Sequence, residues 1–237
     1  MKRIAINIIA TNKYVVFLEN LCASISKHFP EDSEIAAIIY TNVDIPEEVT
    51  KNSRINFIRS EINHEPWPAS TIKRFEYFIR EKETLSQYDY SYYIDADSIF
   101  VGDIDNIIFP KTGMVGTIHP CLYNSVGTPE RNPRSNAYIP YGSQNRYYCG
   151  GFFGGKSDNF IEASEKMREW IDDDSKKGIV ALWHDESHLN KYFYENPPSI
   201  VLDHPFAVAE NLTSKSPESK VMFLDKNASG GHDFYRN

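Results

Sequence analysis

Apolar and polar positions follow two alternating spacings along the first hundred residues, one typical of buried strands and the other of helices. Apolar runs of strand length lie at 3–10, 35–41, 55–58 and 90–94. Between them, apolar side chains recur every three or four positions over 13–29 and from about 69 to 85, which predicts two helices, with Pro30 ending the first. Strands that alternate with helices predict an α/β fold with a mainly parallel, Rossmann-like sheet flanked by helices.

The second half of the chain has a weaker pattern. Residues 101–155 are rich in tyrosine and turn-forming residues and predict little regular structure. Helical spacing returns over 159–172 and again from about 185 to 193, and a short strand is expected from residue 220. The three carboxylates at 172–174 are expected to form a solvated helix end and not a metal site, because no strand positions them against a sheet.

Length and composition narrow the class of protein. The 237 residues suit one domain with a sizeable core, and 41% apolar with 24% charged residues is an ordinary globular balance. A net charge of −8 argues against nucleic acid as a partner, because no excess of cations is present to neutralise phosphates. No run of 18 apolar residues is present, so we expect no transmembrane segment. The 14% of aromatic residues fits an aromatic core or, as an alternative, sugar recognition.

The positions of the cysteines and glycines argue against a disulfide framework, a zinc site and the glycine-rich nucleotide-binding motifs. Cys22, Cys121 and Cys149 are too few and too widely spaced for a disulfide framework or a zinc site, which favours a reducing compartment. The apolar start of the chain is short and broken by Asn7, so it is interpreted as a buried strand and not as a signal peptide. No Gly-x-Gly-x-x-Gly follows that strand and no Gly-Lys-Ser/Thr loop occurs, so the dinucleotide and P-loop fingerprints are missing.

The sharpest local motif is Asp95-Ala96-Asp97, directly after the apolar run at 90–94. Ligands of open α/β sheets bind at the carboxyl ends of strands, and two carboxylates one residue apart there can turn toward one hard cation. Such a cation keeps coordination positions for diphosphate oxygens. Asp-x-Asp alone is a weak motif, and Asp103-Ile104-Asp105 is interpreted as an ordinary turn.

Glycines alternate with aromatic residues over Tyr147–Gly155. Glycine allows a ligand to approach the backbone closely, although the same segment also fits a bulged, tightly packed strand. Further along, the segment Trp183–His188 places an aromatic residue, two acids and two histidines at the start of a helix, as a polyol-binding and charge-stabilising site would. Asp185 also suits the capping of that helix, and the missing third ligand argues against zinc on the two histidines.

The end of the chain is basic, with Lys226, His232 and Arg236 around Gly230 and Gly231. A tail of this kind suits either of two roles. It folds over a diphosphate and supplies cations to it, or it is a solvated terminus.

Taken in order, these motifs resemble glycosyltransferase family 6, the family of the histo-blood-group A and B transferases and the α1,3-galactosyltransferases. The resemblance is carried by Lys13-Tyr14-Val15, Trp67, Lys73-Arg74-Phe75, Asp95-Ala96-Asp97, His119-Pro120, Glu130-Arg131, Ala137-Tyr138-Ile139-Pro140, the segment 147–155 and the segment 183–192. It covers nearly the whole chain and implies a single catalytic domain of the glycosyltransferase A-type fold. In that domain, 1–100 would bind the nucleotide sugar, and 101–237 would bind the acceptor and end in a closing tail.

The resemblance also implies chemistry. Members transfer a sugar from a uridine-diphosphate (UDP) donor to the 3-hydroxyl of a galactose, with α1,3 linkage and retained configuration, and we expect a galactose-terminated, fucosylated acceptor. Many bacterial relatives carry Asn-x-Asn at the metal motif, whereas Asp95 and Asp97 imply dependence on Mn²⁺ or a similar cation. Without the anchor and stem of vertebrate members, the chain looks like a bacterial or viral-type member. We expect it in the cytoplasm, peripheral to the membrane where lipid-linked glycans are assembled.

Site residues follow from matching positions. The implied donor-binding residues are Ile9, Ala10, Thr11, Tyr14, Arg74, Asp95, Ala96, Asp97, Cys149, Gly150, Gly151, Asp185, Lys226 and Arg236. The implied acceptor-binding residues are His119, Trp183 and Glu186, and Glu186 is also the candidate catalytic carboxylate beneath the reacting carbon. Because Gly151 has no side chain, we expect room there for an acetamido group, and hence N-acetylgalactosamine transfer in preference to galactose transfer.

Two alternatives from other classes stay open on the sequence. One is a catalytically silent sugar-binding module of the same fold, against which the intact Asp95, Asp97 and Glu186 argue. The other is a metal-dependent nucleotidyltransferase, against which the missing phosphate-binding glycine loop argues.

Overall fold

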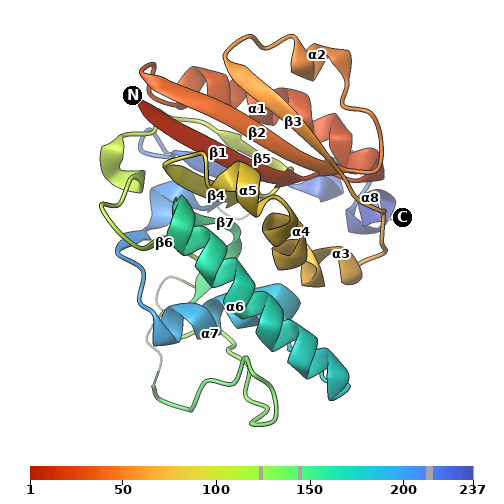
Figure 1. The fold of residues 1–237 in the computed structure, drawn as a ribbon, viewed down its shortest axis with the longest axis vertical. Coiled ribbons are helices and arrows are strands. Elements are labelled where there is room, and N and C mark those ends of the chain that lie inside the picture. Colours follow the sequence, from red (N-terminus) through yellow and green to blue (C-terminus); the bar gives the residue numbers. More distant parts are fainter. Residues whose placement is uncertain (123–124, 144–145, 212–215, 237) are drawn as a thin grey trace.

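The computed structural model describes residues 1–122, 125–143, 146–211 and 216–236, and it confirms the α/β fold. The strands of the central sheet are β1 (Lys2–Ile9), β2 (Ser33–Thr41), β3 (Ile55–Glu61), β4 (Tyr90–Ile94), β6 (Met114–Ile118), β7 (Tyr148–Lys156) and β8 (Ile200–Leu202). Their order across the sheet is β3-β2-β1-β4-β7-β6-β8 (Figure 1). All neighbours are parallel except around β7, which runs antiparallel to β4 and β6.

The antiparallel strand β7 borders the Asp-x-Asp turn at the carboxyl end of β4. Ile94, the last residue of β4, pairs with Phe152, so the first residues of β7 extend past the carboxyl end of β4. Beyond that pair the two chains stay together, since the Asp95 amide donates to the Gly151 carbonyl at 2.9 Å. The segment 147–155 is thus a buried strand, one of its two interpretations, and it also borders the Asp-x-Asp turn.

Helices cover both faces of this sheet. On one face, α4, α6 and α7 lie side by side, and α1 lies on the opposite face with α2 beside it (Figure 1). The helices are η1 (Asn12–Phe17), α1 (Leu18–His28), α2 (Glu47–Thr50), α3 (Ala69–Ile72), α4 (Arg74–Arg80), α5 (Lys82–Leu85), η2 (Asn106–Ile108), α6 (Ser157–Lys176), α7 (His184–Glu195), η3 (His204–Phe206), η4 (Lys226–Ser229) and α8 (His232–Arg236).

Two of the expected helices are broken. The helix expected over 13–29 begins as the 3-10 helix η1, and the one expected over 69–85 is divided into α3, α4 and α5. The first division of the latter falls at Lys73, which has φ −84° and ψ 0° and pairs with Glu65. The break turns the next residue, Arg74, into the interior.

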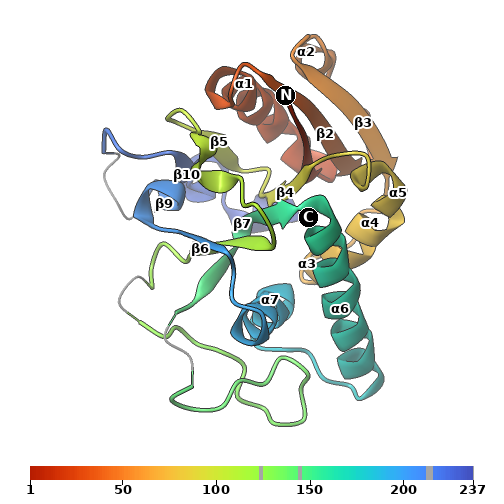
Figure 2. The same cartoon turned by 60° about the vertical axis from the view of Figure 1, so that its left-hand side comes forward.

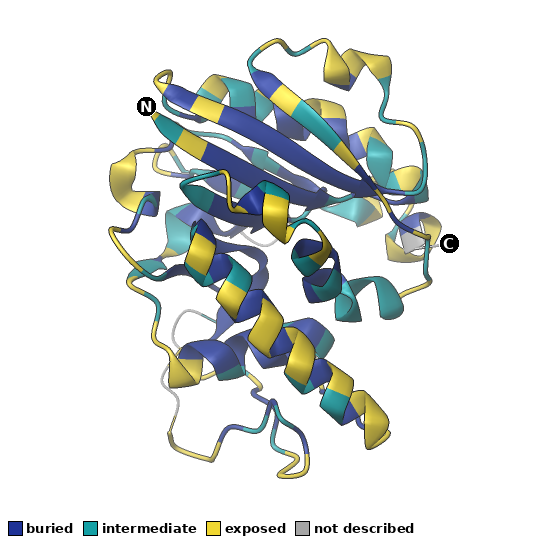
Figure 3. Cartoon of the chain, viewed as in Figure 1, coloured by how far each residue is buried: buried dark blue, intermediate teal, exposed yellow. Residues whose placement is uncertain are grey.

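The first strand, β1, is largely apolar because both of its faces are buried in the core. Ile4, Ile6 and Ile8 point to the α1 face, and Ala5 points to the opposite one. Asn7, which interrupts the run, is fully buried and satisfied: its amide donates to the Tyr92 carbonyl at 3.0 Å and its oxygen accepts the Tyr40 hydroxyl at 2.9 Å. The central strands are buried along most of their length, whereas α6 keeps one exposed side (Figure 3).

A second, three-stranded sheet was only partly expected. It has the order β5-β10-β9, with β5 at Ser98–Phe100, β9 at Val208–Ala209 and β10 at Val221–Phe223. Figure 2 shows it beside α1. The strand expected from residue 220 is therefore confirmed, and it pairs directly with the strand that follows the Asp-x-Asp turn.

Candidate active site

Two cavities open at the carboxyl edge of the sheet and meet at three side chains. Asp95, Asp97 and Lys226 line both of them. The first cavity has a volume of about 180 Å³ and is lined otherwise by residues of the first hundred and by Tyr235. The second has a volume of about 260 Å³ and also contains Glu186. A ligand that extends across both would therefore have its middle portion at the paired carboxylates.

The paired carboxylates have different partners. Asp97 forms an ion pair with the Lys226 ammonium, which comes from η4 in the tail. Asp95 accepts the hydroxyl of Tyr93 at 2.6 Å and lies 3.7 Å from the Arg74 guanidinium. Burial raises the pKa of Asp95 and the neighbouring Asp97 raises it further, while Arg74 opposes both. The turn after β4 thus places two acids at the border of both cavities.

Arg74 braces the site from α4. Its Nη1 donates to the Gly150 carbonyl at 2.6 Å and lies 3.0 Å from an Asp185 oxygen, and its guanidinium stacks 4.1 Å from the centre of the Tyr93 ring. The side chain is almost fully buried. Its Nε is buried and has no acceptor among the described residues, and the side chain lines the first cavity.

The start of α7 carries the other two acids. Asp185 and Glu186 lie in its first turn, where the helix dipole favours negative charge, and His184 begins the helix with a left-handed φ of +52°. A Glu186 oxygen accepts the Gly150 amide at 2.7 Å. Burial raises the pKa of Glu186 to about 7 and also raises the pKa of Asp185.

The glycine segment lies between the two acidic groups. Gly150 contacts both Arg74 and Glu186 through its backbone, and Cys149 and Gly151 line the second cavity. A Cβ placed on Gly151 would lie 2.6 Å from the Phe223 ring. Gly151 also lines the second cavity, and the preference for an N-acetylated sugar stays a prediction.

The residues matched to the uridine lie around the first cavity. Ile9, Thr11 and Tyr14 line it together with Ala96. Ala10 is fully buried between them and contributes a backbone amide, which donates to the Tyr40 carbonyl.

On the acceptor side, His119 lines the second cavity beside Glu186. Its Nδ1 accepts the Cys121 amide at 3.2 Å, and burial lowers its pKa, so the ring is neutral. Trp183 and Asp185 line neither cavity. Trp183 is half exposed and its indole donates to Thr128 at 2.6 Å.

The tail contributes residues to both cavities. Lys226 reaches the paired carboxylates, whereas the side chain of Arg236 lies outside the described residues and its role stays a prediction. Tyr235 lines the first cavity, with its ring 5.6 Å from that of Tyr14 and 4.9 Å from that of Phe17.

Some residues that line the two cavities are not predicted as site residues by the sequence. Trp67 belongs to a motif of the family and Tyr93 adjoins the Asp-x-Asp motif, so the sequence offered a local indication for these two. His64 and Phe223 had no local signal at all. The residues concerned are His64, Trp67, Tyr93, Phe223 and Tyr235.

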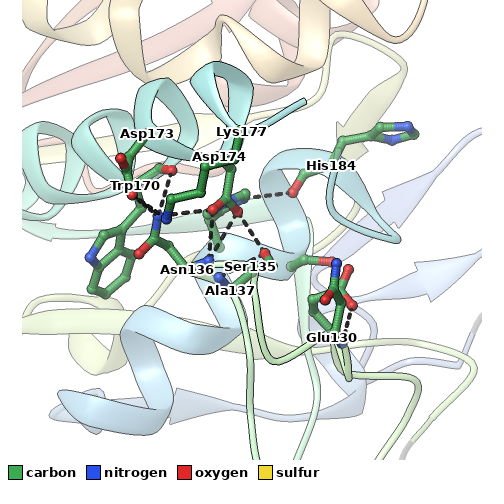
Figure 4. Close-up of polar contacts among 12 residues, drawn as sticks. Glu130, Ser135, Asn136, Ala137, Trp170, Asp173, Asp174, Lys177 and His184 are labelled. Atoms are coloured by element: carbon green, nitrogen blue, oxygen red, sulfur yellow. Dashed lines mark hydrogen bonds and ion pairs between the residues drawn. The ribbon is translucent and has the colours of Figure 1, made fainter. Parts of the chain in front are cut away.

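Behind α7, a polar network fixes the helix from the side away from the cavities (Figure 4). Asp174, at the end of α6, is buried and accepts hydrogen bonds from Ser135 at 2.6 Å and from the Asn136 amide at 2.8 Å. The His188 ring lies 3.2 Å from the same carboxylate and 3.0 Å from the His184 carbonyl. The solvated helix end expected at 172–174 is therefore wrong for Asp174, which anchors a loop and a helix.

The acidic edge suits a hard divalent cation. Four carboxyl groups, those of Asp95, Asp97, Asp185 and Glu186, face two cationic side chains, Arg74 and Lys226. The Lys226 ammonium already occupies a cation position on Asp97. Asp95 and Asp97 together offer the carboxylate oxygens that such ions prefer, so the donor set fits Mn²⁺ or a similar ion.

The sheet and its acidic edge define a glycosyltransferase of the A-type fold. A family model for glycosyltransferase family 6 matches residues 2–229, and the chain belongs to this family. No helix in the described part of the chain combines the length and apolar character that crossing a bilayer requires.

Named relatives come from animals and bacteria. The chain is 31% identical to "Histo-blood group ABO system transferase 1" of Rattus norvegicus over 216 residues, 88% of this chain and 62% of the rat protein. It is 27% identical to "O-antigen biosynthesis glycosyltransferase WbnI" of Escherichia coli over 221 residues, 92% of each chain. It is also 27% identical to human "Globoside alpha-1,3-N-acetylgalactosaminyltransferase 1" over 238 residues, 95% of this chain and 67% of the human protein. The chain thus spans less than two thirds of the rat relative.

Proposed function

We propose that this glycosyltransferase moves galactose or N-acetylgalactosamine from a UDP-sugar to the 3-hydroxyl of a galactose, forming an α1,3 linkage with retained configuration. The observation that carries the proposal is the meeting of two cavities at Asp95, Asp97 and Lys226, with Glu186 in the second one. A nucleoside fits the first cavity, a diphosphate fits the junction and a hexose fits the second. The name of the human relative supports N-acetylgalactosamine as a sugar and the α1,3 linkage.

The diphosphate leaving group is bound where the two cavities meet, at Asp95, Asp97 and Lys226. Asp95 and Asp97 would hold a Mn²⁺ or similar ion, which supplies positive charge to the diphosphate as it leaves. Lys226 moves from Asp97 onto a diphosphate oxygen and adds a second positive charge. Arg74 holds Asp185 and the Gly150 carbonyl in place at the edge of the first cavity.

Glu186 acts at the other side of the reacting carbon. As the bond to the diphosphate breaks, positive charge develops at the anomeric carbon, and an ionised carboxylate there stabilises it or attacks it. The Gly150 amide orients the carboxylate through its 2.7 Å hydrogen bond. The acceptor, which we propose to be a galactose-terminated and fucosylated glycan, enters past His119 and the half-exposed Trp183.

Product analysis tests the proposal directly. The purified chain is incubated with UDP-galactose or UDP-N-acetylgalactosamine, Mn²⁺ and galactosides with and without fucose, and the products are analysed by mass spectrometry and linkage analysis. We expect a hexose-extended acceptor and free UDP. A Asp97→Asn variant should lose most of this activity, whereas Asp172→Asn, at an exposed carboxylate of α6, should keep it. Release of pyrophosphate would indicate a nucleotidyltransferase, and binding without turnover of any donor would indicate a sugar-binding module.

A further inference from the structure

The loop 128–140 carries two of the motifs that resemble the family, Glu130-Arg131 and the segment 137–140, but it takes no direct part in the site. Its residues, all of which the structure describes, line neither cavity. Glu130 is the one acid of this loop, and it is only 7% exposed. A buried carboxyl group costs free energy unless hydrogen bonds satisfy it, so its partners indicate its role.

Both oxygens of Glu130 accept backbone amides. Oε1 accepts the amide of Asn132 at 2.7 Å, within the same loop. Oε2 accepts the amide of Leu182, also at 2.7 Å, which lies 52 residues further along the chain and just before α7. The Glu130 carbonyl accepts the Ile139 amide at 3.0 Å and closes the loop on itself. The carboxyl group thus ties a closed loop to the segment that leads into α7.

That segment bends sharply as it enters the helix. His184 has a left-handed φ of +52°, and its amide donates to the Ala181 carbonyl at 2.9 Å. The Trp183 amide donates to the Ser187 hydroxyl at 2.9 Å. A left-handed backbone is unfavourable for a residue with a side chain and persists where its surroundings hold it. The direction in which α7 begins therefore depends on what holds the segment 181–183.

Trp183 connects this segment to the reactive carboxyl group. Its indole donates to the Thr128 hydroxyl at 2.6 Å, so the loop binds two consecutive residues, Leu182 and Trp183. The Trp183 carbonyl accepts the Glu186 amide at 3.0 Å, and Glu186 lines the second cavity. A continuous series of hydrogen bonds and backbone thus leads from Glu130 to Glu186.

On the basis of the proposed function, we propose that Glu130 is a positioning residue for sugar transfer, which through Leu182 holds Trp183 and the first turn of α7 in the orientation that the acceptor and the reacting carbon require. A displacement of about 1 Å in a reacting group can reduce the rate by about a hundredfold, even when the altered residue lies far from the chemistry. No described residue of α7 lines the first cavity, so nucleotide binding there should not depend on Glu130.

Kinetics of two variants test the role. Glu130→Gln keeps one oxygen and loses one of the two amide partners, whereas Glu130→Leu loses both. We expect kcat/KM for the galactoside acceptor to fall by at least about tenfold in Glu130→Leu and by less in Glu130→Gln. The Kd of UDP with Mn²⁺, measured by calorimetry, should stay within about twofold of the wild-type value. Glu169→Gln, at an exposed glutamate of α6, is the matched control and should behave as the wild type.

A spectroscopic measurement tests the contact without any activity. The chain has three tryptophans, so the indole N–H signals of the ¹⁵N-labelled protein can be assigned with Trp183→Phe. The Trp183 signal should shift in both Glu130 variants by more than the signal of Trp170.

The outcomes separate this inference from the proposed function. An unmoved Trp183 signal, or a loss of stability with unchanged kcat/KM, would reduce Glu130 to a structural residue. Weakening of UDP binding equal to the loss in turnover would also overturn the role on the acceptor side. Turnover of no UDP-sugar by the wild type would instead overturn the proposed function.

Discussion

On the two sides of helix α7, the pKa values of two carboxyl groups, those of Glu186 and Asp174, are shifted in opposite directions. Toward the cavities, Glu186 receives the Gly150 amide, and burial raises its pKa to about 7. On the far side, burial would also raise the pKa of Asp174, but hydrogen bonds from His188, Ser135 and Asn136 hold it below its usual value. Burial raises the pKa of both carboxyl groups, and at Asp174 the hydrogen bonds from His188, Ser135 and Asn136 outweigh it.

The comparison separates a supporting region from a reactive one. Nδ1 of His188 faces a carbonyl and Nε2 faces the Asp174 carboxylate, and both partners only accept hydrogen bonds. The ring is thus held between the His184 carbonyl and the Asp174 carboxylate. These contacts lie within the network, whereas the acids near Gly150 are left to respond to a ligand.

The largest expected effect is on the reactive side. Glu186→Gln removes the charge that stabilises a developing cation, so we expect turnover to fall by at least about a hundredfold. Affinity for the donor, measured by calorimetry, should stay within a few-fold, because the interaction strengthens only in the transition state. Glu195→Gln, at the other end of α7, serves as the control and should keep normal turnover. A Glu186→Gln enzyme with near-normal turnover would place the chemistry elsewhere.

The next effect is on the supporting side. Asp174→Asn removes the charged acceptor that binds Ser135 and the Asn136 amide and turns an NH₂ group toward donors, so we expect a loss of roughly 3 kcal/mol in the free energy of unfolding. The measurement is urea denaturation. Asp172→Asn, on the exposed side of the same helix end, should change stability by less than about 0.5 kcal/mol. Similar losses for the two variants would mean that the network contributes little.

The pH dependence of stability distinguishes the two sides further. Because the pKa of Glu186 rises from 4.5 to about 7 on folding, the folded protein keeps a proton that the unfolded chain releases, and stability falls as pH rises through this window. Glu186→Gln removes that penalty. Its stability relative to the wild type should therefore increase between pH 5 and pH 8, by on the order of 3 kcal/mol. A difference that does not change with pH would show that the carboxyl group titrates normally.

The smallest expected effect concerns the cation on Asp97. Lys226→Ala removes an ammonium that competes for this carboxylate, so Mn²⁺ should bind about fivefold more tightly in the absence of nucleotide. With UDP present the sign should reverse, since Lys226 then contributes to diphosphate binding. Electron paramagnetic resonance of free Mn²⁺ gives both values, with the exposed Lys111→Ala as the control. Unchanged affinity in both states would show that the lysine and the metal do not compete.

Sequence patterns predicted the parts of the molecule that depend on neighbouring residues. The apolar runs at 3–10 and 35–41 became β1 and β2, since each is buried on both faces. The Asp-x-Asp motif and the segment around Glu186 can be recognised from a few consecutive residues. The structure brings both to one edge of the sheet.

Features that depend on distant partners could not be predicted in this way. The acids at 172–174 look alike in sequence, but Asp174 is buried, and it binds a loop that lies almost forty residues earlier in the chain. The space over Gly151 depends on Phe223, which reaches it through the pairing of β10 with β5. The break at Lys73 likewise follows from the burial of Arg74 against β7 and α7, and not from local helix propensity.

The pairing of β10 has a consequence for the order in which the protein matures. The turn that holds Asp97 is tied to the Leu224 amide, and β5 has β10 as its partner in the three-stranded sheet. During synthesis, β1, β2 and β4 can pair before residues 221–226 have left the ribosome, but the acidic turn lacks its Leu224 and Lys226 partners until then. The turn therefore reaches its final set of contacts later than the strands that carry it.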